Sequence, residues 1–100
     1  MKELVIPPAA QSDSESWELL RAWVADHGLH CSVKVGVYEA EGIPEDQAWG
    51  TILADAARHV ADAMSSLGIK ESEVALAGIR PAFEAELDEP TSKRSGNLVQ

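Results

Sequence analysis

The residues "LHCSVKVGVYE" carry the strongest single constraint on the fold, because apolar and polar side chains alternate along them. The odd-numbered side chains from Cys31 to Val37 would point to one face of a strand, and the even-numbered ones, which include Lys34 and Tyr38, to the other. This alternation predicts a strand over residues 29–38. One strand cannot form a sheet by itself, since its backbone N–H and C=O groups would stay unpaired.

The partner of that strand is the first question that the sequence raises. Residues 3–6, "ELVI", could form a short strand or an extended arm, but two short strands are only marginally stable, and four residues cannot cover nine. An exposed strand edge is a template for pairing with another chain, and two-fold homodimers are the commonest oligomers. We therefore expect a homodimer through the edge of strand 29–38, with Trp23, Lys34 and Tyr38 as candidate interface residues.

Three helices are predicted around this strand. Ser12 and Glu15 have the spacing of a capping box, so the first helix would begin after Ser12 and end before Gly28. The second and longest would run from Pro44 to Leu67 and end at Gly68. The third would cover residues 71–87, where Pro81 should kink it or divide it into two pieces.

The longest predicted helix has a continuous apolar stripe at three- and four-residue spacing, which we expect to face the core. The stripe consists of Trp49, Ile52, Leu53, Ala56, Val60, Met64 and Leu67. Together these elements predict an α+β fold in which three helices pack on a short β-sheet, in the order (β)-α-β-α-α. We expect a single domain over residues 1–90 and a disordered tail over residues 91–100, because the tail is polar and rich in small residues.

Charge and composition indicate which classes of partner the chain is expected to bind. The 100 residues include 17 acidic and 8 basic side chains, for a net charge of −9, and the basic residues are spread singly except for Lys93 and Arg94. Nucleic acids and anionic membranes attract clustered cations, so neither is an expected partner. The start of the chain lacks the apolar run of a signal peptide, and Cys31 has no second cysteine to pair with. These features favour a cytoplasmic location.

Asp55, Arg58 and His59 form the first candidate site, since they lie within about one turn of the longest helix. In a catalytic role His59 would be the acid or base, Asp55 would orient it, and Arg58 would hold an anionic group. In a structural role the same side chains would form i,i+3 and i,i+4 pairs on a solvated helix face. A concave pocket with His59 and Arg58 on its wall would distinguish the two interpretations.

The stretch "DHGLHC" offers nitrogen and sulfur ligands close together in His27, His30 and Cys31. A structural zinc site needs four ligands, commonly two close pairs. The chain has no second pair, and a strand places His30 and Cys31 on opposite faces of the sheet. We therefore expect no metal site here, and no sequence motif implies a cofactor.

The pieces "ELVIP", "AWG" followed by "L-x-D-x-x-RH-V-A", and "IRPAFEAEL" with "PTS" resemble a small family of uncharacterised bacterial proteins, which is catalogued as a domain of unknown function. The resemblance covers roughly residues 3 to 92, and its most specific part is Trp49–Gly50 with the Asp55, Arg58 and His59 positions. It implies a bacterial, cytoplasmic protein with a small α+β fold and no assigned activity.

Two function classes follow. The favoured one is a non-enzymatic interaction or accessory module, homodimeric and acidic on its surface. The alternative is a small-molecule-binding protein or minor enzyme that uses Asp55, Arg58 and His59.

Overall fold

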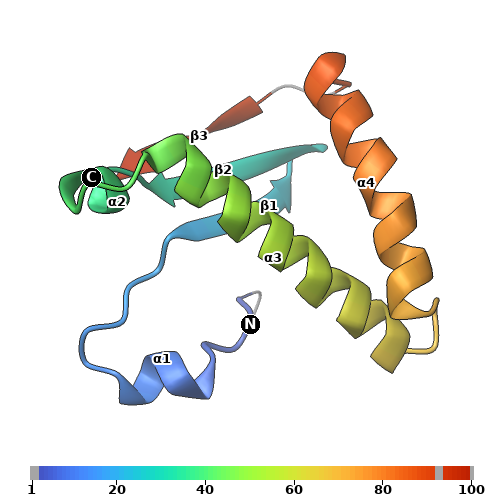
Figure 1. Cartoon of the computed structure of the whole chain (residues 1–100), viewed down its shortest axis with the longest axis horizontal. Helices are drawn as coiled ribbons and strands as arrows, with labels where there is room; N and C mark the ends of the chain where they lie inside the picture. The colour runs from blue at the N-terminus through green and yellow to red at the C-terminus, as the bar shows by residue number, and fades with distance from the viewer. Residues whose placement is uncertain (1–2, 92–93, 100) are drawn as a thin grey trace.

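The computed structural model describes residues 3–91 and 94–99 and has an α+β fold, as the sequence predicts (Figure 1). Its elements in chain order are α1 (Pro8–Ser12), β1 (Leu20–Ala25), β2 (Gly28–Lys34), α2 (Val37–Ala40), α3 (Glu45–Ser66), α4 (Ser72–Asp88) and β3 (Arg94–Val99). The expected order (β)-α-β-α-α is therefore wrong in its first half and at its end, although the class is right.

The predicted strand is the centre of the sheet and not its edge. β1 pairs with β2 antiparallel, and β3 pairs with β2 parallel, so the order is β1-β2-β3. β2 is paired on both sides within the chain, so it has no free edge for the expected homodimer through strand 29–38. The strand also ends early, because Gly36 takes a left-handed conformation with φ 107° and Val37 begins α2.

The predicted helix between Ser12 and Gly28 is wrong, since its second half is β1. Two local features redirect the chain. The Asp13 carboxylate accepts the N–H of Glu15 at 2.9 Å, which forms a turn in place of a capping box. Further on, Asp26 and His27 have φ of 50° and 59°, the pair of positive values that a two-residue type I′ hairpin turn requires.

The C-terminal stretch also differs from the expected disordered tail. Residues 94–99 run parallel to β2 as β3, so they complete the sheet. The remainder of the expected tail beyond residue 91, namely residues 92, 93 and 100, lies outside the described residues.

The two long helices are close to their predicted limits. α3 follows the expected span, and Gly68 ends the helix region in a left-handed conformation with φ 72°. α4 is a single helix of 17 residues with Pro81 inside it, so the proline does not divide it. Figure 1 shows α3 and α4 meeting at the loop around Gly68 and diverging from there.

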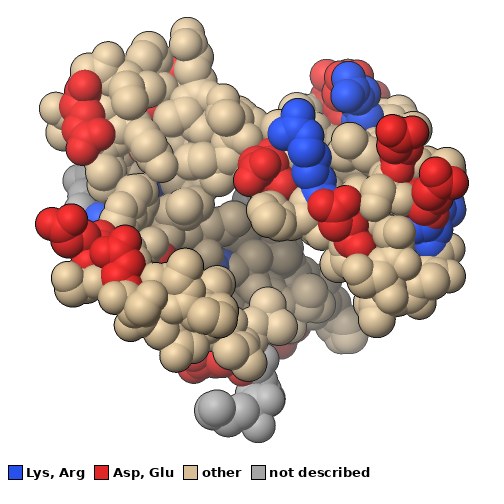
Figure 2. Space-filling model, turned by 60° about the horizontal axis from the view of Figure 1, so that its bottom comes forward, with Lys and Arg blue, Asp and Glu red and all other residues tan. Residues whose placement is uncertain are grey.

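Burial within residues 3–91 is limited to two small side chains, Ala61 of α3 and Ala75 of α4, which are 2% and 3% exposed. The predicted core stripe of α3 is only partly covered, because Val60 is 53% and Leu67 75% exposed. Figure 2 shows two lobes separated by a hollow, with α4 and the end of α3 in one of them. The helices therefore pack on each other through alanines near their loop and leave larger apolar side chains uncovered.

Candidate functional site

The predicted cluster on α3 exists as a set of contacts. The Arg58 guanidinium lies 3.8 Å from one carboxylate oxygen of Asp55, and the His59 Nε2 lies 3.4 Å from the other. The side chains of Asp55 and Arg58 are 64% exposed and that of His59 is 79% exposed. At this exposure water screens the pairing strongly, so the contacts are those of a solvated helix face.

A groove lies between α3 and α4 where the two helices diverge, with a volume of about 410 Å³. Its apolar lining includes Leu53 and Ala57 from α3 and Ile79, Phe83 and Leu87 from α4. The amphipathic period of each helix puts these residues on the sides that face each other. The groove opens away from the loop, near which Ala61 and Ala75 are the two buried side chains of the helices.

The charged side chains of this groove are Arg58, Arg80 and Glu84. Arg58 therefore lies on the wall of a concave site, whereas His59 and Asp55 are outside its lining. The structure places only one member of the predicted cluster at a pocket. A base at His59 would act on the exposed side of α3, away from the apolar surface that could bind a substrate.

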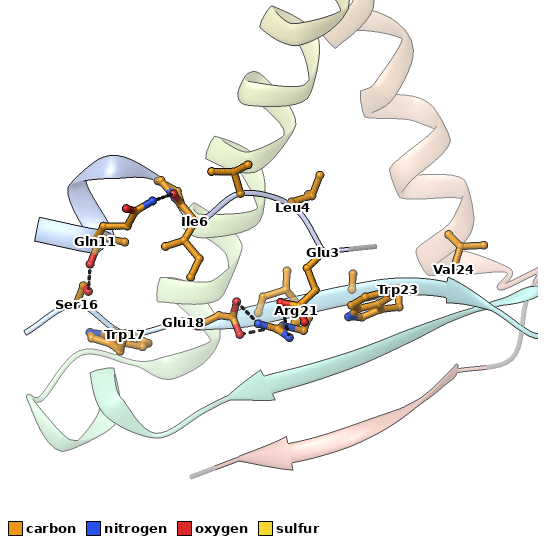
Figure 3. Close-up of a pocket in the computed structure, with 15 residues that line it drawn as sticks. Glu3, Leu4, Ile6, Gln11, Ser16, Trp17, Glu18, Arg21, Trp23 and Val24 are labelled. Carbon is orange, nitrogen blue, oxygen red and sulfur yellow. Dashed lines mark hydrogen bonds and ion pairs between the residues drawn. The ribbon is translucent and has the colours of Figure 1, made fainter. Parts of the chain in front are cut away.

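A second groove, of about 830 Å³, lies between the N-terminal arm and β1 (Figure 3). Residues 3–6 form no ladder with the described strands, but Arg21 of β1 holds the arm through an ion pair with Glu3 at 3.7 Å. Arg21 also pairs with Glu18 at 3.1 Å, and this hydrogen bond, together with the charge of Glu3, raises the pKa of Arg21 above its ordinary value.

The three predicted interface residues are separated by the fold. Trp23 is half-buried on β1 and lines the groove beside the N-terminal arm, as Figure 3 shows. Lys34 ends β2, and its backbone N–H donates to the carbonyl of Leu19 at 3.0 Å. Tyr38 belongs to α2 and packs its ring against Trp17, with 5.9 Å between ring centroids. These residues do not form one surface on a shared strand.

A carboxylate network joins α2 to α3. The backbone N–H of Glu39 donates to the carboxylate of Glu45 at 3.0 Å, the N–H of Glu45 donates back to Glu39 at 3.3 Å, and the indole N–H of Trp49 donates to Glu45 at 2.9 Å. These donors favour the charged form, so the pKa of Glu45 is lowered, chiefly by the Glu39 N–H. The network fixes the start of α3 and has no reactive partner.

The residues considered as metal ligands do not lie together in the fold. They are His27, His30 and Cys31. His30 is the cross-strand partner of Trp23 and Cys31 that of Ala22, so the two point to opposite faces of the sheet. His27 lies in the β1–β2 turn. The part of the chain that the structure describes contains no group of three or more His, Cys, Asp or Glu side chains placed to hold a metal ion.

One known protein family matches almost the whole chain. The profile of the family described as "Domain of unknown function (DUF5076)" matches residues 3–91. The chain belongs to this family. The match confirms the expectation of an uncharacterised domain family and covers every element except β3. No functionally curated protein matches the chain.

A solved structure is similar to this DUF5076 chain over its whole length. It is named as a "putative pyruvate dehydrogenase from the photosynthetic bacterium Rhodopseudomonas palustrus CGA009". The two are 30% identical, with a TM-score of 0.69, and the match covers 100% of this chain and 97% of the other. The α+β architecture is therefore shared with a protein of nearly the same length.

Sequence reasoning missed part of the DUF5076 groove. Arg80 and Glu84 were not predicted as site residues, although their i,i+4 spacing places them side by side on α4. Phe83 and Leu87 lie at four-residue spacing on α4, and an apolar stripe has the same pattern whether it faces a core or an open groove. No helix in the described part of the chain is long and apolar enough to cross a membrane.

Proposed function

We propose that this protein is a non-enzymatic interaction module of the bacterial cytoplasm, which works through the groove between α3 and α4. The observation that carries the proposal is the exposure of large apolar side chains in and beside this groove. Phe83 is 47% exposed, Leu87 69% and Leu53 37%. Contiguous exposed apolar surface on a folded domain marks a site of interaction, because leaving it in water is unfavourable.

The charges around the groove support association with a macromolecule. Arg58 and Arg80 flank the apolar lining, so an incoming surface can bury its apolar side chains and pair its carboxylates with the guanidinium groups. Arginine is enriched at interfaces for this reason. The rest of the chain is acidic, with 17 acidic side chains against 8 basic ones, which would keep the free module soluble.

The alternative function, a small-molecule-binding protein or minor enzyme, has one specific observation in its favour. The groove volume of about 410 Å³ is within the range of ligand sites, and Arg58 could bind an anionic group there. His59 as the acid or base has less support, because its side chain is 79% exposed and is not part of the lining.

The name of the structural neighbour suggests a further enzyme, a pyruvate dehydrogenase. Oxidation of pyruvate depends on cofactors that carry the chemistry, such as thiamine diphosphate and a nicotinamide. An interaction module would give no NADH when the purified chain is incubated with pyruvate, thiamine diphosphate, coenzyme A and NAD. NADH formation that is lost in Arg58→Ala would replace our proposal with the enzymatic one.

Co-purification with matched variants tests the module directly. Phe83→Glu places a charge in the groove, and Val74→Glu places the same charge on α4 outside the groove, at a side chain that is 53% exposed. We expect proteins bound by the wild-type chain in its host to be retained by Val74→Glu and lost by Phe83→Glu. If the two variants retain the same proteins as the wild type, the groove is not the interaction surface.

A further inference from the structure

The surface area of the chain exceeds what a folded monomer of its size should have. Its accessible surface is 8415 Å², whereas a compact monomer of 10.7 kDa has about 5,500 Å². The radius of gyration is 15.3 Å against about 13 Å for a compact domain of 100 residues. The excess is about 2,900 Å² per chain, or about 5,800 Å² for two chains, which exceeds the total area of about 2,000–5,000 Å² that obligate dimers commonly bury.

Part of the uncovered area is an open wedge on α3 and α4, and another part is the N-terminal arm, where Leu4 and Val5 are 93% and 85% exposed. Along α4 the exposed fraction rises from 3% at Ala75 to 47% at Phe83 and 69% at Leu87, as the helix moves away from α3. On α3, Ala61 is 2% exposed near the loop and Leu53 37% exposed at the open end. Four-helix bundles contain pairs of antiparallel helices that pack on one another through their apolar faces, so a second hairpin is a suitable cover for the open side of this one.

The charged side chains at the wedge are of both signs, so they can pair between two copies of the same surface. The lining of the wedge has two cationic side chains, Arg58 and Arg80, and one acidic side chain, Glu84, although acidic residues outnumber basic ones two to one in the chain as a whole. A second copy of this chain presents the same Arg58, Arg80 and Glu84. In a two-fold interface each side meets its own surface, so Arg80 of one copy can meet Glu84 of the other.

We propose that the occupant of the α3–α4 groove is a second copy of this chain, which completes an antiparallel four-helix core at a two-fold axis. This inference rests on the proposed interaction function and names its partner. A small ligand of about 410 Å³ would fill the groove but would leave exposed side chains of α3 outside it, such as Val60 and Leu67, in water. A second hairpin is large enough to fill the groove and also to cover these side chains.

Sedimentation equilibrium of the full chain over a range of micromolar concentrations tests the proposal. We expect a mass of twice 10.7 kDa for the wild type and for Val74→Glu. Phe83→Glu should raise the dissociation constant by more than about 30-fold, the effect of losing a central interface residue. Because Phe83→Glu could disturb the hairpin itself, Leu87→Glu at the more exposed end is the second variant, and circular dichroism reports the fold of each.

A charge exchange identifies the second copy as the partner. Arg80→Glu and Glu84→Arg should each weaken the dimer, and the double variant should restore it. A wild-type chain that stays at 10.7 kDa overturns the dimer but leaves the module intact if host proteins still bind in a groove-dependent manner. A dimer that persists in both Phe83→Glu and Leu87→Glu places the interface elsewhere and overturns the use of the groove as well.

Discussion

Two hairpins in this chain turn through residues with positive φ, but different residue types occupy the two turns. The helical hairpin turns at Gly68, with φ 72°, and the β-hairpin turns at Asp26 and His27, with φ of 50° and 59°. Glycine adopts positive φ without a steric cost, whereas other residues rarely do. The first turn therefore has a signal in the sequence, and the second one has almost none.

The two hairpins also differ in whether local or long-range contacts stabilise them. Each helix of the α3–α4 hairpin is stabilised by hydrogen bonds within itself, and the most buried side chains of the two helices are Ala61 and Ala75 near their loop. β1 has no such internal support, because its backbone pairs with β2 from Leu20↔Val33 to Ala25↔Gly28. Residues 20–25 become a strand only when that partner is in place.

The largest effect should come from the contact that holds the helical hairpin. Ala61→Asp would bury an unpaired charge at a side chain that is 2% exposed, and we expect it to lower the free energy of unfolding by at least about 3 kcal/mol. Ala63→Asp makes the same change at an exposed position of the same helix and is the control. Equal losses in urea titrations of the two variants would show that α3 and α4 do not depend on this contact.

The Gly68 turn should be the next most sensitive. Gly68→Ala has no side-chain clash, since open space surrounds the position, so its cost is that of the left-handed backbone alone. We expect a loss of about 1 kcal/mol, read as a drop of several degrees in the melting temperature. An unchanged melting temperature would mean that the loop between α3 and α4 relaxes without cost.

The β-hairpin turn should respond in the opposite direction. His27→Gly relieves a positive φ at a residue with a side chain, and we expect a gain of up to about 1 kcal/mol after the greater freedom of glycine in the unfolded chain is subtracted. Thermal unfolding of Gly68→Ala and His27→Gly, measured under the same conditions, compares the two turns. A loss of stability in His27→Gly would show that the His27 side chain has a structural role.

The Glu45 network should contribute at neutral pH and fade in acid. The folded-state pKa of Glu45 lies below its ordinary value of 4.5, so its stabilisation is present above the unfolded pKa and is lost as pH falls through the folded pKa. Wild type should therefore be more stable than Glu45→Gln near pH 7, and the difference should shrink below about pH 4.5. The exposed Glu41→Gln is the control, and a difference independent of pH would contradict the assignment.

The smallest effect should come from the Asp55–Arg58–His59 face. Arg58→Ala removes an ion pair between side chains that are 64% exposed, and we expect a change in the free energy of unfolding of less than about 1 kcal/mol. Chemical denaturation in the Phe83→Glu background, which we expect to be monomeric, isolates this contribution from any effect on association. A loss of several kcal/mol there would show that this face belongs to a buried network.

The sequence alone determined the features that depend on local periodicity. It predicts the α+β class, the limits of α3, the start and end of α4 and the end of the helix at Gly68, because helix caps and a 3.6-residue repeat act within one segment. It also predicts the contacts of Asp55 with Arg58 and His59, since i,i+3 and i,i+4 spacing fixes them once the helix forms.

Only the tertiary structure decided which surfaces meet. The apolar stripe of α3 reads as a core pattern, yet Val60 and Leu67 are open to solvent, because one edge of the stripe contacts α4 and the other has no partner within residues 3–91. The strand predicted at residues 29–38 reads as an edge, yet β1 and β3 pair on both sides of its observed counterpart β2. Periodicity specifies which side of an element is apolar, but the element that covers this side is chosen by contacts far apart in the sequence.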